Sequence, residues 1–147
     1  MASTVHASAV LAGALAVLIR GPAGAGKSRL ALALIEAGQN GLLSFARLVG
    51  DDRVELAAAH GRLLARPAPR LAGLIEVRGL GIRRLAHEPV AVVGLVVDLA
   101  APGAVRLPHA DREVMLEGVK IPHLAVTAGT DPLPPVLACL LTEGAEI

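Results

Sequence analysis

The stretch Gly21-Pro-Ala-Gly-Ala-Gly-Lys-Ser28 fits the pattern G-x-x-x-x-G-K-[ST], with an apolar segment before it and a helical pattern after it. In a phosphate-binding loop the glycines let successive N–H groups turn towards phosphate oxygens, and the following helix N-terminus favours the same anion. Lys27 would then reach the β- and γ-phosphates, and the Ser28 hydroxyl would ligate Mg²⁺. The pattern therefore predicts nucleotide binding. The predicted nucleotide site consists of Gly21, Pro22, Ala23, Gly24, Ala25, Gly26, Lys27 and Ser28.

The size and composition of the chain narrow the function further. Its 147 residues suffice for a single domain over residues 1–147. A net charge of +1 gives no electrostatic case for binding nucleic acid or a membrane surface, and Phe45 as the sole aromatic residue leaves no stacking platform for single strands. The single Cys139 excludes an internal disulfide and fits a reducing cytoplasm; we expect it to be a small core residue of the last helix.

The segment Val5–Ile19 is apolar enough to suggest a signal peptide or a membrane span. His6 and Ser8 interrupt it, however, no basic region precedes it, and it is shorter than the roughly 20 residues that cross a bilayer. Two buried strands are the better interpretation, and no membrane partner is expected.

Periodicity and turn residues predict alternating strands and helices, hence an α/β fold. Gly38 is expected to follow the end of the first helix, and Pro102, Pro108 and Pro122 to cut residues 101–126 into short pieces. Strands are predicted at Val5–Leu11, Leu15–Arg20, Phe45–Val49, Arg53–Ala58, Arg62–Arg66, Leu74–Arg78 and Val90–Leu99, and helices at Ser28–Ala37 and Pro135–Leu141.

Two acidic segments lie downstream of the loop. Asp51-Asp52 ends an apolar strand, where one carboxylate can orient Mg²⁺ through water and the other can take a proton from an attacking hydroxyl. Glu76 stands at a strand end before Gly79-Leu-Gly81 and is a candidate second magnesium ligand. Both patterns also occur in ordinary solvated segments. Their occurrence together with the phosphate loop is what favours a functional role.

The order of these features carries a family resemblance. His6 comes first, then the loop, Val49-Gly-Asp-Asp52, Glu76-Val-Arg-Gly-Leu-Gly-Ile82 and Asp111-Arg112. Together they resemble the catalytic domain of bacterial HPr kinase/phosphorylase over nearly the whole chain, without that family's usual N-terminal domain. The resemblance implies a P-loop kinase-type fold of the HPr kinase/phosphoenolpyruvate carboxykinase kind, with mixed β-sheets around the loop helix.

The resemblance also implies an activity: ATP- and Mg²⁺-dependent phosphorylation of a serine of HPr or a related phosphocarrier, in a cytoplasmic homo-oligomer that is hexameric in the family. Asp51 matches the base that accepts the serine proton, and Asp52 supports the same site. Lys27 matches the phosphate-binding lysine, while Ser28 and Glu76 match the magnesium ligands. His6 and Arg112 match two further active-site positions.

The chain departs from the family pattern in the loop, at Arg29 after it, in the insertion-like Asn40–Phe45 and in a late segment. Pro22-Ala23 replaces Asp-Ser inside the loop, which leaves nucleotide binding intact but changes loop stiffness and charge. The late segment tied to dephosphorylation is here Val126–Asp131, without its arginine, so kinase activity is the safer expectation than phosphorylase activity. The alternatives left open are a phosphatase-biased member, a P-loop small-molecule kinase, and a nucleotide-sensing regulatory module without turnover.

Overall fold

Strand β3 (Leu15–Arg20), which leads into the phosphate loop, runs through the middle of a mixed sheet. The computed structural model describes residues 3–101 and 112–145, and within these ranges the sheet has nine strands. Strand β3 pairs antiparallel with β2 (Ser8–Ala12) and parallel with β9 (Ala91–Leu99). The strand predicted at Val90–Leu99 is therefore confirmed, and it lies in the middle of the sheet.

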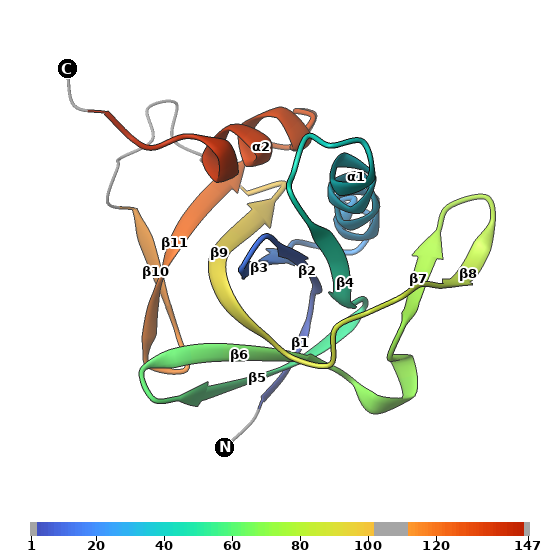
Figure 1. Cartoon of the computed structure of the whole chain (residues 1–147), viewed down its shortest axis with the longest axis horizontal. Helices are drawn as coiled ribbons and strands as arrows, with labels where there is room; N and C mark the ends of the chain where they lie inside the picture. Colours follow the sequence, from blue (N-terminus) through green and yellow to red (C-terminus); the bar gives the residue numbers. More distant parts are fainter. Residues whose placement is uncertain (1–2, 102–111, 146–147) are drawn as a thin grey trace.

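Strand β9 connects two parts of the sheet, and Figure 1 shows it curving from one to the other. Its first residues pair antiparallel with β6 (Arg62–Pro67), which forms a hairpin with β5 (Arg53–Ala59). Its second half pairs parallel with both β3 and β11 (Val119–Val126). The ends of β3, β9 and β11 therefore meet at the edge of the sheet that carries the loop.

Helices cover one face of these central strands and the β5–β6 hairpin covers the other (Figure 1). Alternate residues of β3 enter the two resulting cores: Val17 and Ile19 pack on the side of α1 (Lys27–Gln39) and α2 (Leu133–Leu141), and Ala16 and Leu18 on the hairpin side. Each fully buried Leu, Ile or Val contributes about 1.5–3 kcal/mol. The two aliphatic cores thus hold the loop strand from both faces.

The remaining strands form the rim near the loop. Strand β1 (Ser3–His6) pairs with β5, and β4 (Ala46–Gly50) pairs with β2 at the sheet edge. A short 3-10 helix, Pro69–Leu71, leads to a separate hairpin of β7 (Leu74–Val77) and β8 (Gly81–Arg84), which projects from the body in Figure 1. This hairpin faces the loop across the end of β4.

Several predicted boundaries were wrong, and each has a physical reason. The single strand expected at Val5–Leu11 is two strands that break at Ala7, because β1 joins β5 whereas β2 joins β3 and β4. The first helix does not stop before Gly38 but continues to Gln39. A side chain at Gly38 would bring its Cβ within 2.7 Å of the Cβ of Ala46, so this glycine allows β4 to pass close to α1.

The stretch after β9 holds more structure than its prolines suggested. Strand β10 (Glu113–Leu116) and β11 form a hairpin, and Pro122 stands where β11 stops pairing with β10 and begins pairing with β9. A residue without an N–H is tolerated at such a changeover. Strand β8 was also missed. The last helix begins at Leu133 rather than Pro135, and Cys139 lies exposed on its outer face, because only the opposite face packs on the core through Val136.

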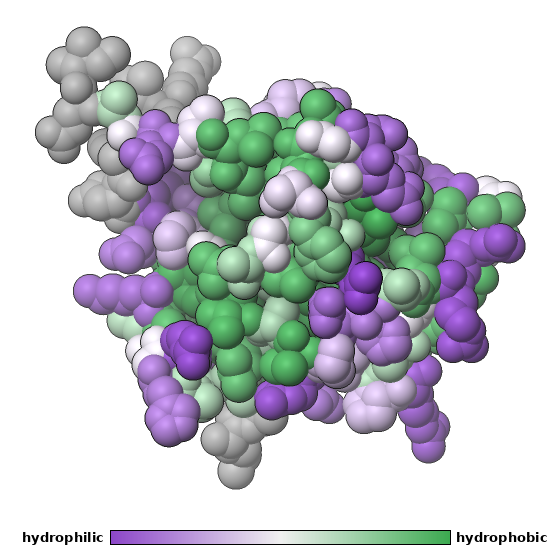
Figure 2. Space-filling model, viewed as in Figure 1, coloured by the Kyte–Doolittle hydropathy of each residue, from purple (hydrophilic) through white to green (hydrophobic). Residues whose placement is uncertain are grey.

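Apolar side chains remain visible on the surface. Figure 2 shows them gathered over the middle of one face, with hydrophilic residues around the rim. Within residues 3–101 and 112–145, neither helix is long and apolar enough to cross a membrane.

Candidate active site

The phosphate loop joins β3 to α1, as the sequence predicted. Gly24 and Gly26 adopt φ angles of 82° and 100°, a left-handed conformation that favours glycine, and a Cβ built on either meets nothing within 4 Å. There is therefore open space beside the loop at both glycines. Helix α1 has no side-chain cap at Gly26 and no acidic residue in its first turn, so its N-terminal dipole is free to act on an anion.

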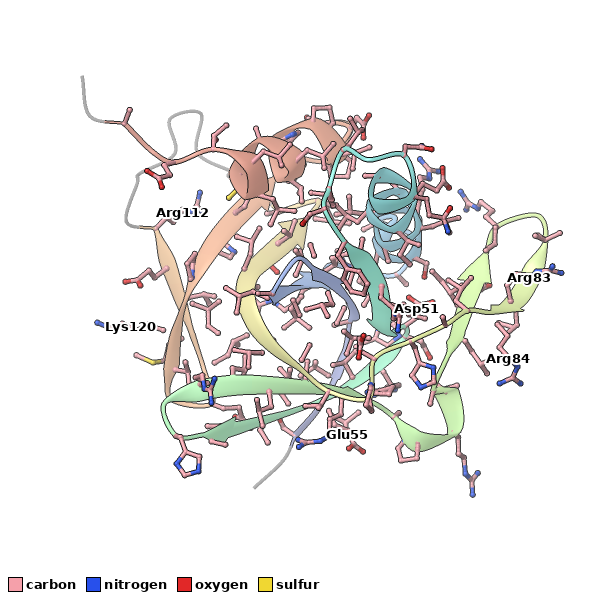
Figure 3. All side chains as sticks on the ribbon, viewed as in Figure 1. Asp51, Glu55, Arg83, Arg84, Arg112 and Lys120 are labelled. Atoms are coloured by element: carbon pink, nitrogen blue, oxygen red, sulfur yellow. The ribbon has the colours of Figure 1, made fainter. Side chains whose placement is uncertain are left out.

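Lys27 is the first residue of α1 and is only 8% exposed. Its Nζ donates to the carbonyl oxygens of Gly21, at 2.8 Å, and of Pro22, at 3.2 Å. These bonds fold the ammonium group back over the loop, which places its charge beside the loop amides. The other lysine of the chain, Lys120, lies on β11, far from Asp51 in Figure 3.

Asp51 directly follows β4 and is 4% exposed. Its Oδ1 accepts the hydroxyl of Ser8 at 2.5 Å and that of Ser28 at 2.8 Å. Its Oδ2 accepts the Ser28 hydroxyl at 2.9 Å and the backbone N–H of Glu76 at 3.1 Å. The carboxylate therefore ties the loop serine to β2 and to β7, and every one of these donors is electrically neutral.

Asp52 and His6 form a second, more exposed pair beside Asp51. His6 Nε2 lies 2.8 Å from Asp52 Oδ1, and the two side chains are 48% and 60% exposed. Asp52 has a φ of 67°, a left-handed conformation that costs energy in most residues and that Asp tolerates better than bulky ones. This turn sends Asp51 inwards and Asp52 towards the opening.

Glu76 on β7 completes the acidic rim of a cleft of about 1050 Å³. Its side chain is exposed, and the β7–β8 turn forms the opposite wall. The cleft is lined by residues of the loop, of the two acidic segments and of this turn, among them His6, Ser8, Ala23, Gly24, Gly26, Lys27, Ser28, Asp51, Asp52, Glu76, Arg78 and Leu80. The structure thus brings together six of the seven predicted catalytic and metal-binding residues.

Arg112 is the predicted residue that the structure does not bring to the cleft. It precedes β10, and its carbonyl oxygen accepts the N–H of His123 at 3.0 Å. Figure 3 places it on the other side of β9 from Asp51. Its sequence neighbour Asp111 lies outside the described residues. Within one chain, Arg112 therefore has no contact with the loop.

Two polar features near the loop were not predicted from the sequence. Ser8 is fully buried and bonded to Asp51; its only signal was a hydroxyl inside an apolar strand. Asp98 on β9 accepts two bonds from Arg20, from Nε at 2.8 Å and from the terminal nitrogen at 2.7 Å, and lies 2.6 Å from His123 Nε2. Arg20 directly precedes Gly21, so this cluster fixes the start of the loop.

The pKa of Asp98 reflects that environment. Burial by itself would raise the pKa of this carboxyl, but the hydrogen bonds and charges of Arg20 and His123 outweigh it and hold the pKa below its ordinary value. Asp98 is therefore a charged group whose charge is compensated inside the fold.

The donor set of the cleft suits a phosphate ligand with a hard cation. Its oxygen ligands are the Ser28 hydroxyl and the carboxylates of Asp51, Asp52 and Glu76, while Lys27 supplies positive charge. In the part of the chain that the structure describes, no three His, Cys, Asp or Glu side chains are grouped to hold a metal by themselves. Mg²⁺ fits such a site, since it is commonly held by one or two carboxylates together with substrate phosphates.

Fold and site together define a phosphate-loop domain with an acidic residue bonded to the loop serine, the arrangement of a phosphoryl-transfer site. The profile of the HPr serine kinase C-terminal domain matches residues 1–130, and the chain belongs to this family.

The similar proteins agree with this assignment. The chain is 34% identical to an HPr kinase/phosphorylase of Streptococcus thermophilus over 140 residues, covering 87% of this chain and 43% of the relative. It is 32% identical to that of Mycoplasma mycoides over 123 residues, covering 75% and 37%. The solved HPr(Ser) kinase/phosphatase from Coxiella burnetii superimposes with a TM-score of 0.77 at 25% identity, covering 94% of this chain and 93% of that one. The chain thus spans less than half the length of these curated relatives.

Proposed function

We propose that this chain is an ATP- and Mg²⁺-dependent protein kinase that phosphorylates a serine of HPr or of a related phosphocarrier. The names of its relatives support the substrate, and the cleft supports the chemistry. The observation that carries the proposal is the bond of Asp51 to the loop serine, at 2.8 and 2.9 Å. In this proposal the Asp51 carboxylate stands where the transferred phosphoryl group and an incoming hydroxyl would meet.

In this proposal the loop and the start of α1 supply the positive charge that binds the phosphates. Lys27 leaves the carbonyl oxygens of Gly21 and Pro22 and binds the β- and γ-phosphates, and the N–H groups at the start of α1 bind the same oxygens. Phosphoryl transfer has a transition state with charge spread over the γ-phosphoryl oxygens, so fixed positive charge and aligned N–H groups contribute most of the rate.

The acidic residues act on the entering hydroxyl. Asp51 takes the proton of the carrier serine as its oxygen bonds to the γ-phosphorus, while the bond from that phosphorus to the bridging oxygen breaks and ADP leaves with the electron pair. Asp52 and His6, at the exposed mouth of the cleft, orient the entering segment. Ser8 and the N–H of Glu76 keep the Asp51 carboxylate in position.

Ser28 and Glu76 are the proposed holders of Mg²⁺. The fit rests on their chemistry, a hydroxyl and a carboxylate that line one cleft, with Asp51 bonded to the hydroxyl. When bound, the ion neutralises part of the phosphate charge.

The test is transfer of label from γ-labelled ATP to HPr, with an HPr in which the acceptor serine is replaced by alanine as a blank. We expect Lys27→Ala to abolish transfer, and Lys120→Ala, the matched removal of a lysine on β11, to leave it unchanged. Nucleotide binding without transfer to any phosphocarrier or small molecule would favour the nucleotide-sensing module. Transfer to a small molecule instead of the carrier would establish the small-molecule kinase.

The reverse direction has its own readout. Serine-phosphorylated HPr, incubated with inorganic phosphate, should release pyrophosphate if the chain is also a phosphorylase. We propose that this reaction is slower than the forward one, because the segment Val126–Asp131 lacks the arginine expected there.

We further propose that the chain works as a homo-oligomer, hexameric by family resemblance, in which Arg112 serves the cleft of a neighbouring copy. Its place away from the cleft of its own chain supports this arrangement. Mixing inactive Lys27→Ala and Arg112→Ala chains should then restore transfer, since some interfaces combine an intact cleft with an intact Arg112. Failure of the mixture to recover activity would contradict a role across an interface.

A further inference from the structure

A second cavity, of about 370 Å³, lies on the other side of the phosphate loop. One wall consists of Gly26, Arg29 and Ala33 from the loop and α1, and the other of Thr130, Asp131 and Leu133 from the segment that joins β11 to α2. Figure 1 shows the start of α2 next to α1 at this point. The volume is within the range of cavities that bind small organic molecules, about 300–1000 Å³.

The two cavities share Gly26 and Arg29 and are otherwise different in chemistry. The larger cleft holds Lys27, Ser28 and the acidic residues, and so the groups that act on the phosphoryl to be transferred. If the γ-phosphate of a nucleotide lies in the larger cleft, the ribose and base must extend away from that cleft along the loop. The smaller cavity begins where the loop enters α1 and is the built space on that path.

The lining of the smaller cavity suits a flat, largely apolar group with a polar edge. Ala33, Leu133 and Pro132 supply aliphatic surface, while Thr130 and Asp131 supply oxygen atoms. The Asp131 Oδ1 accepts the N–H of Leu133 at 3.1 Å, and the N–H of Thr130 donates to the carbonyl of Thr127 at 3.2 Å. These bonds fix a short turn whose carboxylate can accept from ribose hydroxyls or from an exocyclic amino group.

We infer that this cavity is the nucleoside subsite: the base and ribose of the substrate nucleotide lie between α1 at Ala33 and the turn at Thr130–Asp131. The inference rests on the proposed function, since it needs a nucleotide on the loop. It assigns to the segment between β11 and α2 the recognition of the nucleoside rather than of the transferred phosphoryl group.

The experiment compares binding of MgATP with binding of magnesium tripolyphosphate, which has the phosphates but no nucleoside, by titration calorimetry. Ala33→Leu fills the cavity from the α1 side, and Asp131→Asn removes the carboxylate charge while keeping an oxygen for Leu133. Ala138→Leu, an equal enlargement at an exposed position of α2, is the matched control. Lys27→Ala reports on the loop itself.

Wild type and Ala138→Leu should bind ATP more tightly than tripolyphosphate. Ala33→Leu should lose about tenfold or more of its affinity for ATP and keep its affinity for tripolyphosphate, which also shows that the variant is folded. Asp131→Asn should lose less, again for ATP only.

The two proposals fail in different ways. If Lys27→Ala binds both ligands as well as wild type does, the loop is not the phosphate site and the proposed function fails. If Lys27→Ala loses affinity for both ligands, the loop assignment stands. The nucleoside subsite is then overturned if Ala33→Leu binds ATP normally, or if Ala33→Leu loses affinity for ATP and tripolyphosphate equally. A wild type with no preference for ATP over tripolyphosphate overturns the subsite as well.

Discussion

Two aspartates flank the strand that carries the phosphate loop, and they are bound in opposite ways. Asp51, after β4, accepts hydrogen bonds from two hydroxyls and one backbone N–H. Asp98, on β9, accepts from the guanidinium of Arg20 and contacts His123. Asp51 is buried, whereas Asp98 is only partly buried. Burial therefore does not distinguish Asp51, the proposed catalytic base, from Asp98, which is paired with cationic groups.

The charge of the partners does distinguish them. Neutral donors hold the Asp51 carboxylate in place and leave its negative charge available to a proton or a metal ion. Asp98 is paired with cationic groups, which compensate its charge within the fold. These pairs hold the strand that leads into the loop. We therefore expect substitution of Asp51 to damage activity more than stability, and substitution of Asp98 to do the reverse.

The largest expected effect is on phosphoryl transfer by Asp51→Asn. An amide cannot accept the serine proton, so the single-turnover rate of transfer to HPr should fall by about 10²–10⁴-fold. The amide oxygen can still accept from Ser8 and Ser28, so the free energy of unfolding should change much less than in Asp51→Ala. The readout is label transfer with enzyme in excess over ATP.

Glu55→Gln is the matched control for this loss of charge. Glu55 lies on β5, away from the cleft in Figure 3, and its substitution should leave the rate unchanged. If Asp51→Asn transferred the phosphoryl group as fast as Glu55→Gln, Asp51 would not be the catalytic base. The proposed difference between Asp51 and Asp98 would then be wrong.

The next effect is a loss of stability in Asp98→Asn. Hydrogen bonds to charged groups are worth about 1.5–3 kcal/mol, and partial exposure of this cluster lowers its contribution, so we expect a loss on the order of 2 kcal/mol in urea unfolding. Nucleotide affinity should fall only mildly. A variant of unchanged stability with abolished transfer would show that Asp98, too, is a catalytic group.

The pH dependence of the stability lost in Asp98→Asn follows from the lowered pKa of Asp98. A carboxyl whose folded pKa is depressed contributes stability that is complete above its unfolded pKa, about 3.9, and is lost as the pH falls through the folded value. The stability gap between wild type and Asp98→Asn should thus be present at about pH 5 and shrink below about pH 4. Urea titrations at a series of pH values measure it. A gap that does not shrink between about pH 5 and pH 3 would contradict the charge of Asp98 as its cause.

How much of this could be predicted from sequence depends on how local each signal is. The phosphate loop and the strands β5, β6 and β9 follow from contiguous patterns, and all four were predicted. The candidates Lys27, Ser28, Asp51, Asp52, Glu76 and His6 came from motifs or from family resemblance, and the structure brings them to one cleft.

What escaped prediction depends on contacts between distant residues. The pairing of Arg20 with Asp98 spans 78 positions, and that of Ser8 with Asp51 spans 43. Nothing local marks either partner. Gly38 resembles a helix terminator until β4 is placed against it, and Pro122 resembles a strand breaker until β11 is seen to change partners there. In each case the tertiary contact overrides the local preference.

The smallest expected effect is on the stability of His6→Asn, a variant at the mouth of the cleft. It extends the comparison of Asp51 with Asp98 to a third carboxylate, that of Asp52. His6 and Asp52 are as close as the Asp98 pairs, at 2.8 Å, but both side chains are about half exposed. Exposed ion pairs contribute about 0–1 kcal/mol, so His6→Asn should change the free energy of unfolding by less than about 0.5 kcal/mol. Transfer to HPr should still fall, because the pair lines the cleft. If His6→Asn were instead as destabilising as Asp98→Asn, the pair would hold β1 to the turn after β4, and its role would be structural.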